Sequence, residues 1–189
     1  VLMDYLRVLD NRRQDIPLTA VLSSAFAGLS QEELAEIRCA YPDTAFFESV
    51  TKYREQGENA DIQLKLQKCL DQMDDFRKIV PYTPMHELLQ RVLDDTGYAM
   101  YMSAMPGGIQ RKANIDMLME KAKAFESTSY KGLFHFVRYM EQLQKYDVDY
   151  GEANVEEETA ATVRLITIHT SKGMEFTVVF VAGMGKRFT

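Results

Sequence analysis

The sequence predicts a mainly α fold that ends in a short strand–loop–strand piece. Apolar residues recur at intervals of three and four over most of residues 1–146, and Gly, Pro and capping residues separate these stretches. The C-terminal part reads VRLITIHTSKGMEFTVVFVAGMGKRFT, in which two β-type runs flank a polar loop. We therefore expect a helical domain over 1–146, an acidic linker over 147–162 and a piece of an α/β domain over 163–189.

Residues 1–22 predict two helices. In VLMDYLRVLD, Leu2, Leu6 and Leu9 share one helical face, with Tyr5 beside them. The stretch PLTAVLSS predicts a second, short helix, because Pro17 suits a first helical turn.

Capping residues mark the next two helices. In LSQEELAEIR, Ser30 is the expected N-cap and Glu33, three residues later, completes a capping box. Pro42 ends this helix. The stretch DTAFFESVTKYREQG then predicts another helix, with Asp43 as its N-cap and Gly57 at its end.

The longest helical pattern covers residues 58–80. One apolar stripe at steps of three and four runs along it: Ile62, Leu66, Leu70, Met73 and Phe76. Thr83-Pro84 opens the next predicted helix, and Thr96-Gly97 closes it. Gly107-Gly108 precedes a helix near 109–126, and a last helix runs over about 131–146.

Composition excludes several classes of protein. The net charge of −6 argues against a domain that coats nucleic acid through bulk charge. There is no apolar stretch of about 18 residues and no signal-peptide pattern, so we expect no membrane span and a cytoplasmic location. The chain starts at Val1 and stops directly after a strand-like run, which leads us to expect a segment of a larger protein.

The sulfur-containing and histidine residues favour structural roles. Cys39 and Cys69 lack metal-ligand spacing, so we expect buried thiols in a reducing compartment. His86 and His135 sit singly in helical patterns, without a second ligand three or four residues away, so we expect no metal site. The eleven methionines favour adaptable core packing, and a methionine-lined partner groove is the alternative.

The loop between the two β-type runs carries the strongest chemical signal. Ligands of α/β sheets collect where loops leave strand ends. Gly173 permits close approach of a ligand to the backbone, Lys172 complements phosphate charge, and Glu175 can accept from a sugar hydroxyl, so the loop has parts of a nucleotide site. The stretch GMGK at 183–186 is not a P-loop, because one residue separates its glycines and Arg187 follows the lysine.

These residues carry a resemblance to a known family. The stretch VRLITIHTSKGMEFTVVFVAG resembles motif V of the UvrD-like superfamily-one DNA helicases, in the form V-x-L-x-T-x-H-x-x-K-G-x-E-F-x-x-V-F. YLRVLDNRRQDIPLTAVL and GLSQEELAEIR resemble the opening of the helical insertion called 2B in these enzymes. TGY, GGIQRKANIDMLMEKAKAFE and GLFHFVRYMEQL resemble that insertion in the AddA (RexA) family, which belongs to the bacterial AddAB helicase–nucleases.

The resemblance implies an arrangement of domains. In the family, domain 2B is inserted into the second RecA-like domain, 2A, and the chain re-enters 2A through motif V. Residues 1–146 correspond to a helical 2B domain, and residues 163–189 to the first returning strands of 2A.

The resemblance also implies a role for each loop residue. Thr167 and His169 contact the single-stranded DNA track, together with Ser171. Plain hydrogen bonding within the loop is the alternative for Thr167 and Ser171.

The ATP contacts are implied in the same way. Gly173 offers its backbone N–H to the γ-phosphate of ATP with Lys172 nearby, and Glu175 hydrogen-bonds the ribose. No catalytic residue and no metal ligand is expected in these 189 residues, because they contain no P-loop pattern and none of the family's other helicase motifs.

The implied function is that of a larger bacterial enzyme. The resemblance points to an ATP-dependent 3′→5′ DNA helicase and exonuclease subunit in double-strand break repair and recombination. It implies ATP and Mg²⁺ as cofactors, single- and double-stranded DNA as ligands and the AddB (RexB) protein as partner. Two alternatives stay open: a UvrD/Rep-type helicase without a nuclease, and a helical protein-interaction module, which fits residues 1–146 alone.

Overall fold

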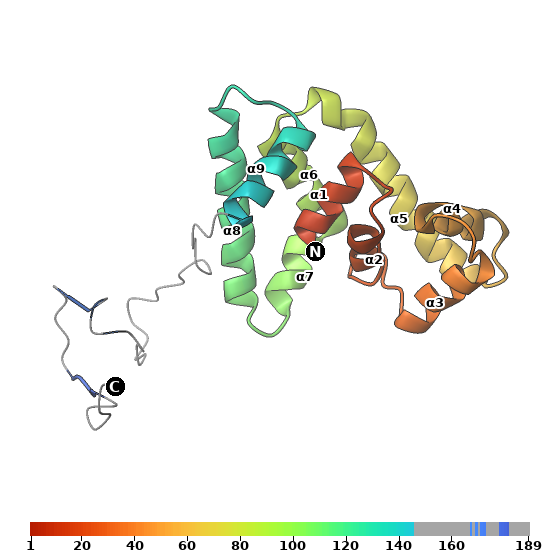
Figure 1. Cartoon of the computed structure of the whole chain (residues 1–189), viewed down its shortest axis with the longest axis horizontal. Helices are drawn as coiled ribbons and strands as arrows, with labels where there is room; N and C mark the ends of the chain where they lie inside the picture. Colours follow the sequence, from red (N-terminus) through yellow and green to blue (C-terminus); the bar gives the residue numbers. More distant parts are fainter. Residues whose placement is uncertain (146–166, 168, 170, 173–177, 182–189) are drawn as a thin grey trace, which may run out of the picture. The chain divides into compact units, whose positions relative to one another are not determined.

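The computed structural model describes residues 1–145, 167, 169, 171, 172 and 178–181. The chain divides into two compact units, Val1–Val155 and Glu156–Thr189. In its described part the first unit is built of helices and their connections, so the prediction of a mainly α fold is confirmed (Figure 1). None of the described helices is long and apolar enough to cross a membrane.

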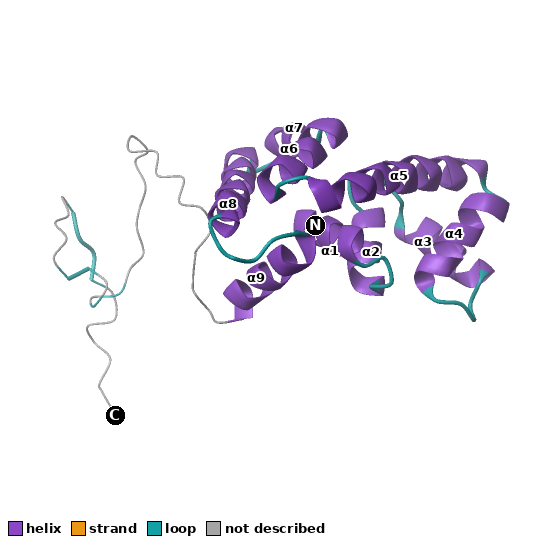
Figure 2. Ribbon diagram, turned by 90° about the horizontal axis from the view of Figure 1, so that it is seen from above, coloured by secondary structure: helices purple, strands orange, loops and turns teal. Residues whose placement is uncertain are grey.

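The helices follow one another with short connections. In chain order they are α1 (Leu2–Asp10), α2 (Asp15–Leu22), α3 (Gln31–Ala40), α4 (Phe46–Gln56), α5 (Ala60–Ile79), the 3₁₀ turn η1 (Val80–Tyr82), α6 (Met85–Thr96), α7 (Tyr98–Ala104), α8 (Gly108–Glu126) and α9 (Leu133–Lys145). Figure 2 shows α5, α6 and α7 in one layer and α1, α2 and α9 in a second layer. Each layer covers the apolar face of the other, which is the usual way for amphipathic helices to build a core.

Helix α1 lies at the centre of this core. It packs against α2, α5 and α9, and its predicted inner face, Leu2, Tyr5, Leu6 and Leu9, is buried. The stripe predicted along α5 is buried as well. Both predictions are confirmed. A helix with a single apolar face removes that face from water by packing it against neighbouring helices.

Aromatic rings join the first half of the helical unit to the second. The Phe26 ring, from the loop after α2, stacks on Tyr5 with centroids 4.3 Å apart and on Tyr98 of α7 with centroids 4.5 Å apart. Such pairs add about 0.5–1.5 kcal/mol each beyond the burial of their area. The stack therefore ties α1 to α7 across more than ninety positions of sequence.

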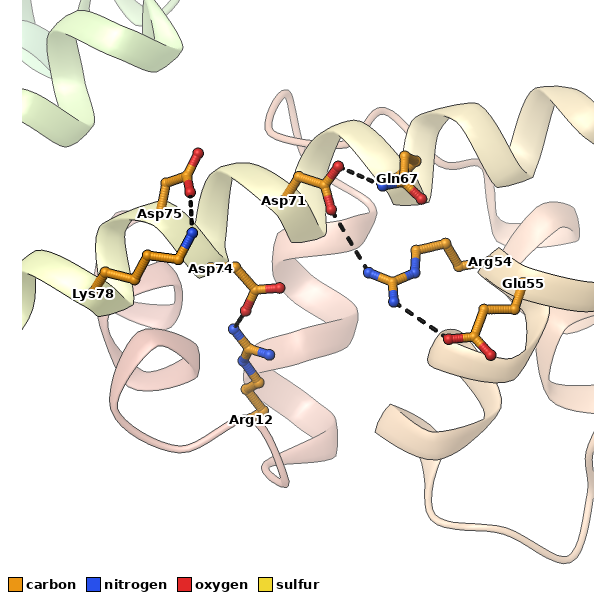
Figure 3. A network of polar contacts seen from close by, with 8 residues as sticks. All are labelled: Arg12, Arg54, Glu55, Gln67, Asp71, Asp74, Asp75 and Lys78. Atoms are coloured by element: carbon orange, nitrogen blue, oxygen red, sulfur yellow. Dashed lines mark hydrogen bonds and ion pairs between the residues drawn. The ribbon is translucent and has the colours of Figure 1, made fainter.

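Polar contacts fix the loop between α1 and α2 on α5 (Figure 3). Arg12 pairs with Asp74, and its guanidinium carbon lies 5.5 Å from the centre of the Phe47 ring. Further along α5, Asp71 lies 3.8 Å from Arg54 of α4. Partly exposed pairs of this kind contribute about 1 kcal/mol or less each, so they orient the loop more than they stabilise it.

Helix ends follow their predicted signals in most places. Ser30 Oγ accepts from the backbone N–H of Glu33 at 3.2 Å, and Glu33 Oε2 accepts from the backbone N–H of Ser30 at 2.7 Å, which confirms the capping box. Gly97 ends α6 in the left-handed conformation, with φ 64°. Glycine adopts this conformation without a Cβ penalty.

One prediction about helices was wrong, and one helix was missed. Asp43 does not cap α4, which begins at Phe46 after Ala45, because residues 42–44 form a turn in which Thr44 Oγ1 donates to the Tyr41 carbonyl at 3.2 Å. Helix α7 was not predicted at all. It follows Gly97 directly, and no capping side chain marks its start.

The expectations for sulfur-containing residues were only partly right. Cys69 is buried, and burial raises the pKa of its thiol to about 12, which makes it unreactive. Cys39 is exposed, because α3 packs against α4 and turns its other face to solvent. Met73 is buried in the core as expected, whereas Met100 is 80 % exposed.

The predicted strand–loop–strand piece is not confirmed. The linker 147–162 and most of the two β-type runs lie outside the described residues. The four described residues of the second run, 178–181, are not in a strand, and Phe180 is 92 % exposed. A run that is apolar on both faces needs neighbouring strands on both sides to become buried, and those strands must come from the rest of a sheet.

Truncation after Asp147 is expected to leave a stably folded helical domain. The described helices bury their apolar faces on one another, so their packing requires no residue of the tail. Circular dichroism should show a cooperative thermal transition within a few degrees of that of the whole chain. Loss of the cooperative transition in the truncated chain would place part of the tail in the core of the helical domain.

Removing the Tyr5 hydroxyl is expected to stabilise the fold. The Tyr5 side chain is fully buried and its Oη has no hydrogen-bond partner among the described residues, whereas Oη of the similarly buried Tyr53 donates to Glu36. A buried unsatisfied polar group costs about 1–3 kcal/mol. Tyr5→Phe should therefore raise the free energy of unfolding, measured in urea, by about 1 kcal/mol.

Tyr53→Phe is the matched variant for this measurement. It removes the same atom from a tyrosine that uses it, so it should lower the free energy of unfolding by about 1–2 kcal/mol. Equal losses in both variants would mean that the Tyr5 hydroxyl is satisfied in solution.

Candidate functional site

The described part of the motif V loop forms a compact turn. The backbone N–H of Ser171 donates to the Thr167 carbonyl at 3.1 Å, and the backbone N–H of Lys172 donates to the His169 carbonyl at 3.4 Å. The first bond spans four residues and the second spans three. The turn therefore brings together four of the six residues predicted for the site.

The turn presents polar side chains to solvent. Thr167, His169 and Lys172 are exposed, and Ser171 is half-buried. An exposed hydroxyl, an imidazole and an ammonium group within six residues can all contact phosphate oxygens, and the ammonium adds a full positive charge. The turn thus has the chemistry of a phosphate-contacting loop.

The other two predicted site residues are not placed. Gly173 and Glu175 lie outside the described residues, so the structure does not test the proposed γ-phosphate and ribose contacts.

His86 forms a polar contact with a carboxylate. Its Nδ1 lies 2.9 Å from Oε1 and 2.8 Å from Oε2 of Glu126, and its backbone N–H donates to Oε1 at 2.9 Å. The contact joins the first turn of α6 to the last turn of α8. Among the described residues no group of three or more His, Cys, Asp or Glu side chains is placed to hold a metal ion.

The contact changes the acidity of Glu126. Partial burial of the carboxylate raises its pKa, but the hydrogen bonds from the backbone and ring of His86 outweigh this effect. The pKa of Glu126 is therefore lowered.

An exposed aromatic cluster lies at the start of α9. It consists of Tyr130, Phe134, His135 and Arg138, all exposed. No sequence motif marked these residues as a functional group. Helical periodicity could have indicated their exposure. The buried positions Leu133, Phe136 and Val137 leave 134, 135 and 138 on the outer face of the helix.

The described helices form at least two clefts. The first, of about 300 Å³, lies among α6, α7 and α8, and Met100 and Met119 line it. These residues correspond to the methionine-lined groove considered from the sequence. The second, of about 440 Å³, lies beside η1 and the start of α9, and Phe125 and Lys131 line it.

A helical domain followed by this loop defines a class of helicase domain. The family model of the UvrD-like helicase C-terminal domain matches residues 1–189, and the chain belongs to this family. The family assignment agrees with the motif V resemblance.

The chain is also similar to ATP-dependent helicase/nuclease subunits of several bacteria. It is 39% identical to that of Oceanobacillus iheyensis over 189 residues, which is 100% of this chain and 15% of the relative. The identity is 40% to the Clostridium acetobutylicum protein over 187 residues, with coverage of 99% and 15%. The Acetivibrio thermocellus protein is 40% identical over 188 residues, with coverage of 100% and 15%. The chain thus spans about 15% of the length of these relatives.

Removing the Glu126 charge is expected to destabilise the fold in a pH-dependent way. A carboxylate with a lowered pKa stabilises the folded state above its unfolded pKa, and this stabilisation disappears as pH falls through the folded pKa. Glu126→Gln should therefore lower stability at pH 7. Its difference from the parent chain should shrink as pH falls below the ordinary glutamate pKa and vanish once pH lies below the lowered folded pKa.

Glu120→Gln is the control, because Glu120 is exposed on the same helix. Urea denaturation of both variants at neutral and acid pH checks the prediction. A Glu126→Gln deficit that is the same at both pH values would show that its carboxylate charge does not contribute.

Proposed function

We propose that residues 1–189 belong to a subunit of an ATP-dependent 3′→5′ DNA helicase and exonuclease that acts in double-strand break repair and recombination in the bacterial cytoplasm. The observation that supports this most strongly is the pattern T-x-H-x-x-K-G-x-E-F at 167–176 within a chain that matches a helicase family model over its whole length. The relatives are named as helicase/nuclease subunits, which supports the nuclease and a multi-subunit complex.

Residues 1–146 act as the 2B domain in this proposal, and 163–189 return to 2A with motif V. The partners are single- and double-stranded DNA and the AddB (RexB) protein. ATP and Mg²⁺ supply the energy of translocation. The described residues hold no acidic cluster for the metal, so Mg²⁺ would be held by other parts of the protein.

In this proposal, different residues of the motif V loop contact single-stranded DNA and ATP. Thr167, His169 and Ser171 contact the single-stranded DNA, and the exposed side chains of the first two suit this role. Lys172 and the Gly173 backbone N–H contact the γ-phosphate, and Glu175 accepts a hydrogen bond from the ribose. The exposed ammonium of Lys172 fits a phosphate contact.

The short spacing of these residues suggests how ATP use is coupled to DNA grip. The backbone bond from Lys172 to His169 joins a phosphate-contacting residue to a DNA-contacting residue within one turn. A change of nucleotide at Lys172 would shift the turn, and with it the DNA contacts. A ligand moves an equilibrium only by its differential affinity for two states, and here both ligands bind the same few residues.

The two alternatives receive less support. A UvrD/Rep-type helicase without a nuclease would share motif V, but the relatives reported above are named as helicase/nuclease subunits. A helical protein-interaction module has no use for the polar pattern at 167–176.

Glu175→Ala in the full-length protein is expected to weaken nucleotide binding. Loss of a hydrogen bond to a charged acceptor, about 1.5–3 kcal/mol, corresponds to roughly ten- to a hundredfold lower ATP affinity. DNA affinity should change much less, because Glu175 faces the ribose. Equilibrium binding of a fluorescent ATP analogue and of a DNA oligonucleotide separates the two effects.

Lys186→Ala provides the matched control, since Lys186 lies in the GMGK stretch that fails the P-loop spacing. It should bind ATP like the parent protein. Unchanged ATP affinity in Glu175→Ala, or a larger loss in Lys186→Ala, would move the nucleotide site away from motif V.

A further inference from the structure

The exposed aromatic cluster at the start of α9 is held in shape by its own contacts. The centroids of Tyr130 and His135 lie 5.4 Å apart, and those of Phe134 and His135 lie 5.3 Å apart at 74°. The Arg138 guanidinium carbon lies 5.8 Å from the centre of the Phe134 ring. Tyr130 is nevertheless 64 % exposed and Phe134 52 % exposed, so each ring still offers surface to a ligand.

The cluster lies in a basic segment of an acidic chain. The chain as a whole carries a net charge of −6. Residues 121–138 contain four basic side chains, Lys121, Lys123, Lys131 and Arg138, and one acidic side chain, Glu126. The carboxylate of Glu126 is already engaged by His86. Arg138 also lies 3.7 Å from Glu141, which Arg7 approaches at 3.4 Å.

The cleft of about 440 Å³ continues this surface. Its lining includes the apolar residues Pro81, Met85 and Phe125, together with Tyr82, Lys131 and the Glu126 that His86 engages. Tyr82 is 87 % exposed. Apolar walls with a cation at the edge suit a flat base whose phosphate stays in solvent.

We propose that this surface, formed by Tyr82, Tyr130, Lys131, Phe134, His135 and Arg138, binds single-stranded nucleic acid. Bases stack on Tyr130 and Phe134, and the cations at 131 and 138 contact phosphates. This inference rests on the proposed function for the origin of its ligand, because a helicase produces single strands. A protein partner is less well matched, since protein interfaces are depleted in lysine whereas nucleic-acid surfaces combine rings with cations.

The test uses the 189-residue chain and a fluorescein-labelled oligothymidylate of about fifteen nucleotides, near the largest site size of a single-strand-binding domain. Fluorescence anisotropy at low salt gives the dissociation constant. The double variant Tyr130→Ala/Phe134→Ala should weaken binding at least about tenfold, because each base–ring contact contributes about five- to a hundredfold. Tyr101→Ala, which removes an exposed tyrosine of α7, should bind like the parent chain.

Salt dependence tests the cations separately. Lys131→Ala should reduce the slope of log affinity against log salt by about 0.7, the value for one phosphate contact on a single strand. Lys68→Ala, an exposed lysine of α5, should leave the slope unchanged. The same oligonucleotide in a duplex should bind more weakly, because its bases are no longer free to stack.

Three results would overturn the proposal. The first is the absence of oligothymidylate binding, which would favour a protein partner for this surface. The second is unchanged binding by the Tyr130/Phe134 double variant, which would place the strand on the tail. The third is equally tight binding of the duplex. None of them bears on ATP binding by Glu175 in the full-length protein. Failure of the stacking surface is therefore distinguishable from failure of the proposed function.

Discussion

The burial of α1 organises the whole helical domain. This short helix contacts α2, α5 and α9, and its Tyr5 side chain lies at one end of the aromatic stack that reaches Tyr98 through Phe26. Arg77 of α5 donates to the carbonyl of Leu9 at 2.6 Å, which satisfies a backbone acceptor at the end of α1. Because α1 is the first helix and its partners come from the whole length of the domain, the core closes only when α9 is in place.

The helical domain and the motif V tail differ in how their apolar residues are buried. The helical domain buries its own apolar faces, whereas the described apolar residues of the tail, 178–181, are exposed. A tail of this composition becomes buried only in a larger sheet. The same division suits a helicase in which the ligand-binding loop belongs to the motor and the helical domain is carried as an insertion.

Charged side chains are unevenly distributed along the helical unit. The carboxylates of Asp71, Asp74 and Asp75 on α5 are each paired with a cation, whereas residues 121–138 carry an excess of basic side chains. The two regions belong to different parts of one helical unit (Figure 1). In the proposed contact with single-stranded nucleic acid, a domain of an acidic chain therefore uses a locally basic segment.

Local patterns in the amino-acid sequence were enough to predict the described α-helices other than α7, most of their ends and the helicase family. The roles of the motif V residues stay a prediction. The capping box at Ser30 involves four consecutive positions, and the α5 stripe repeats every three or four residues. Which side chains meet across long distances in sequence emerges from tertiary packing instead. The contact of His86 with Glu126 and the exposure of Cys39 depend on how helices pack, which no local pattern encodes. The outward position of Phe134 on α9, in contrast, follows from helical periodicity. The ATP contacts of Lys172, Gly173 and Glu175 stay a prediction from the motif, because Gly173 and Glu175 lie outside the described residues.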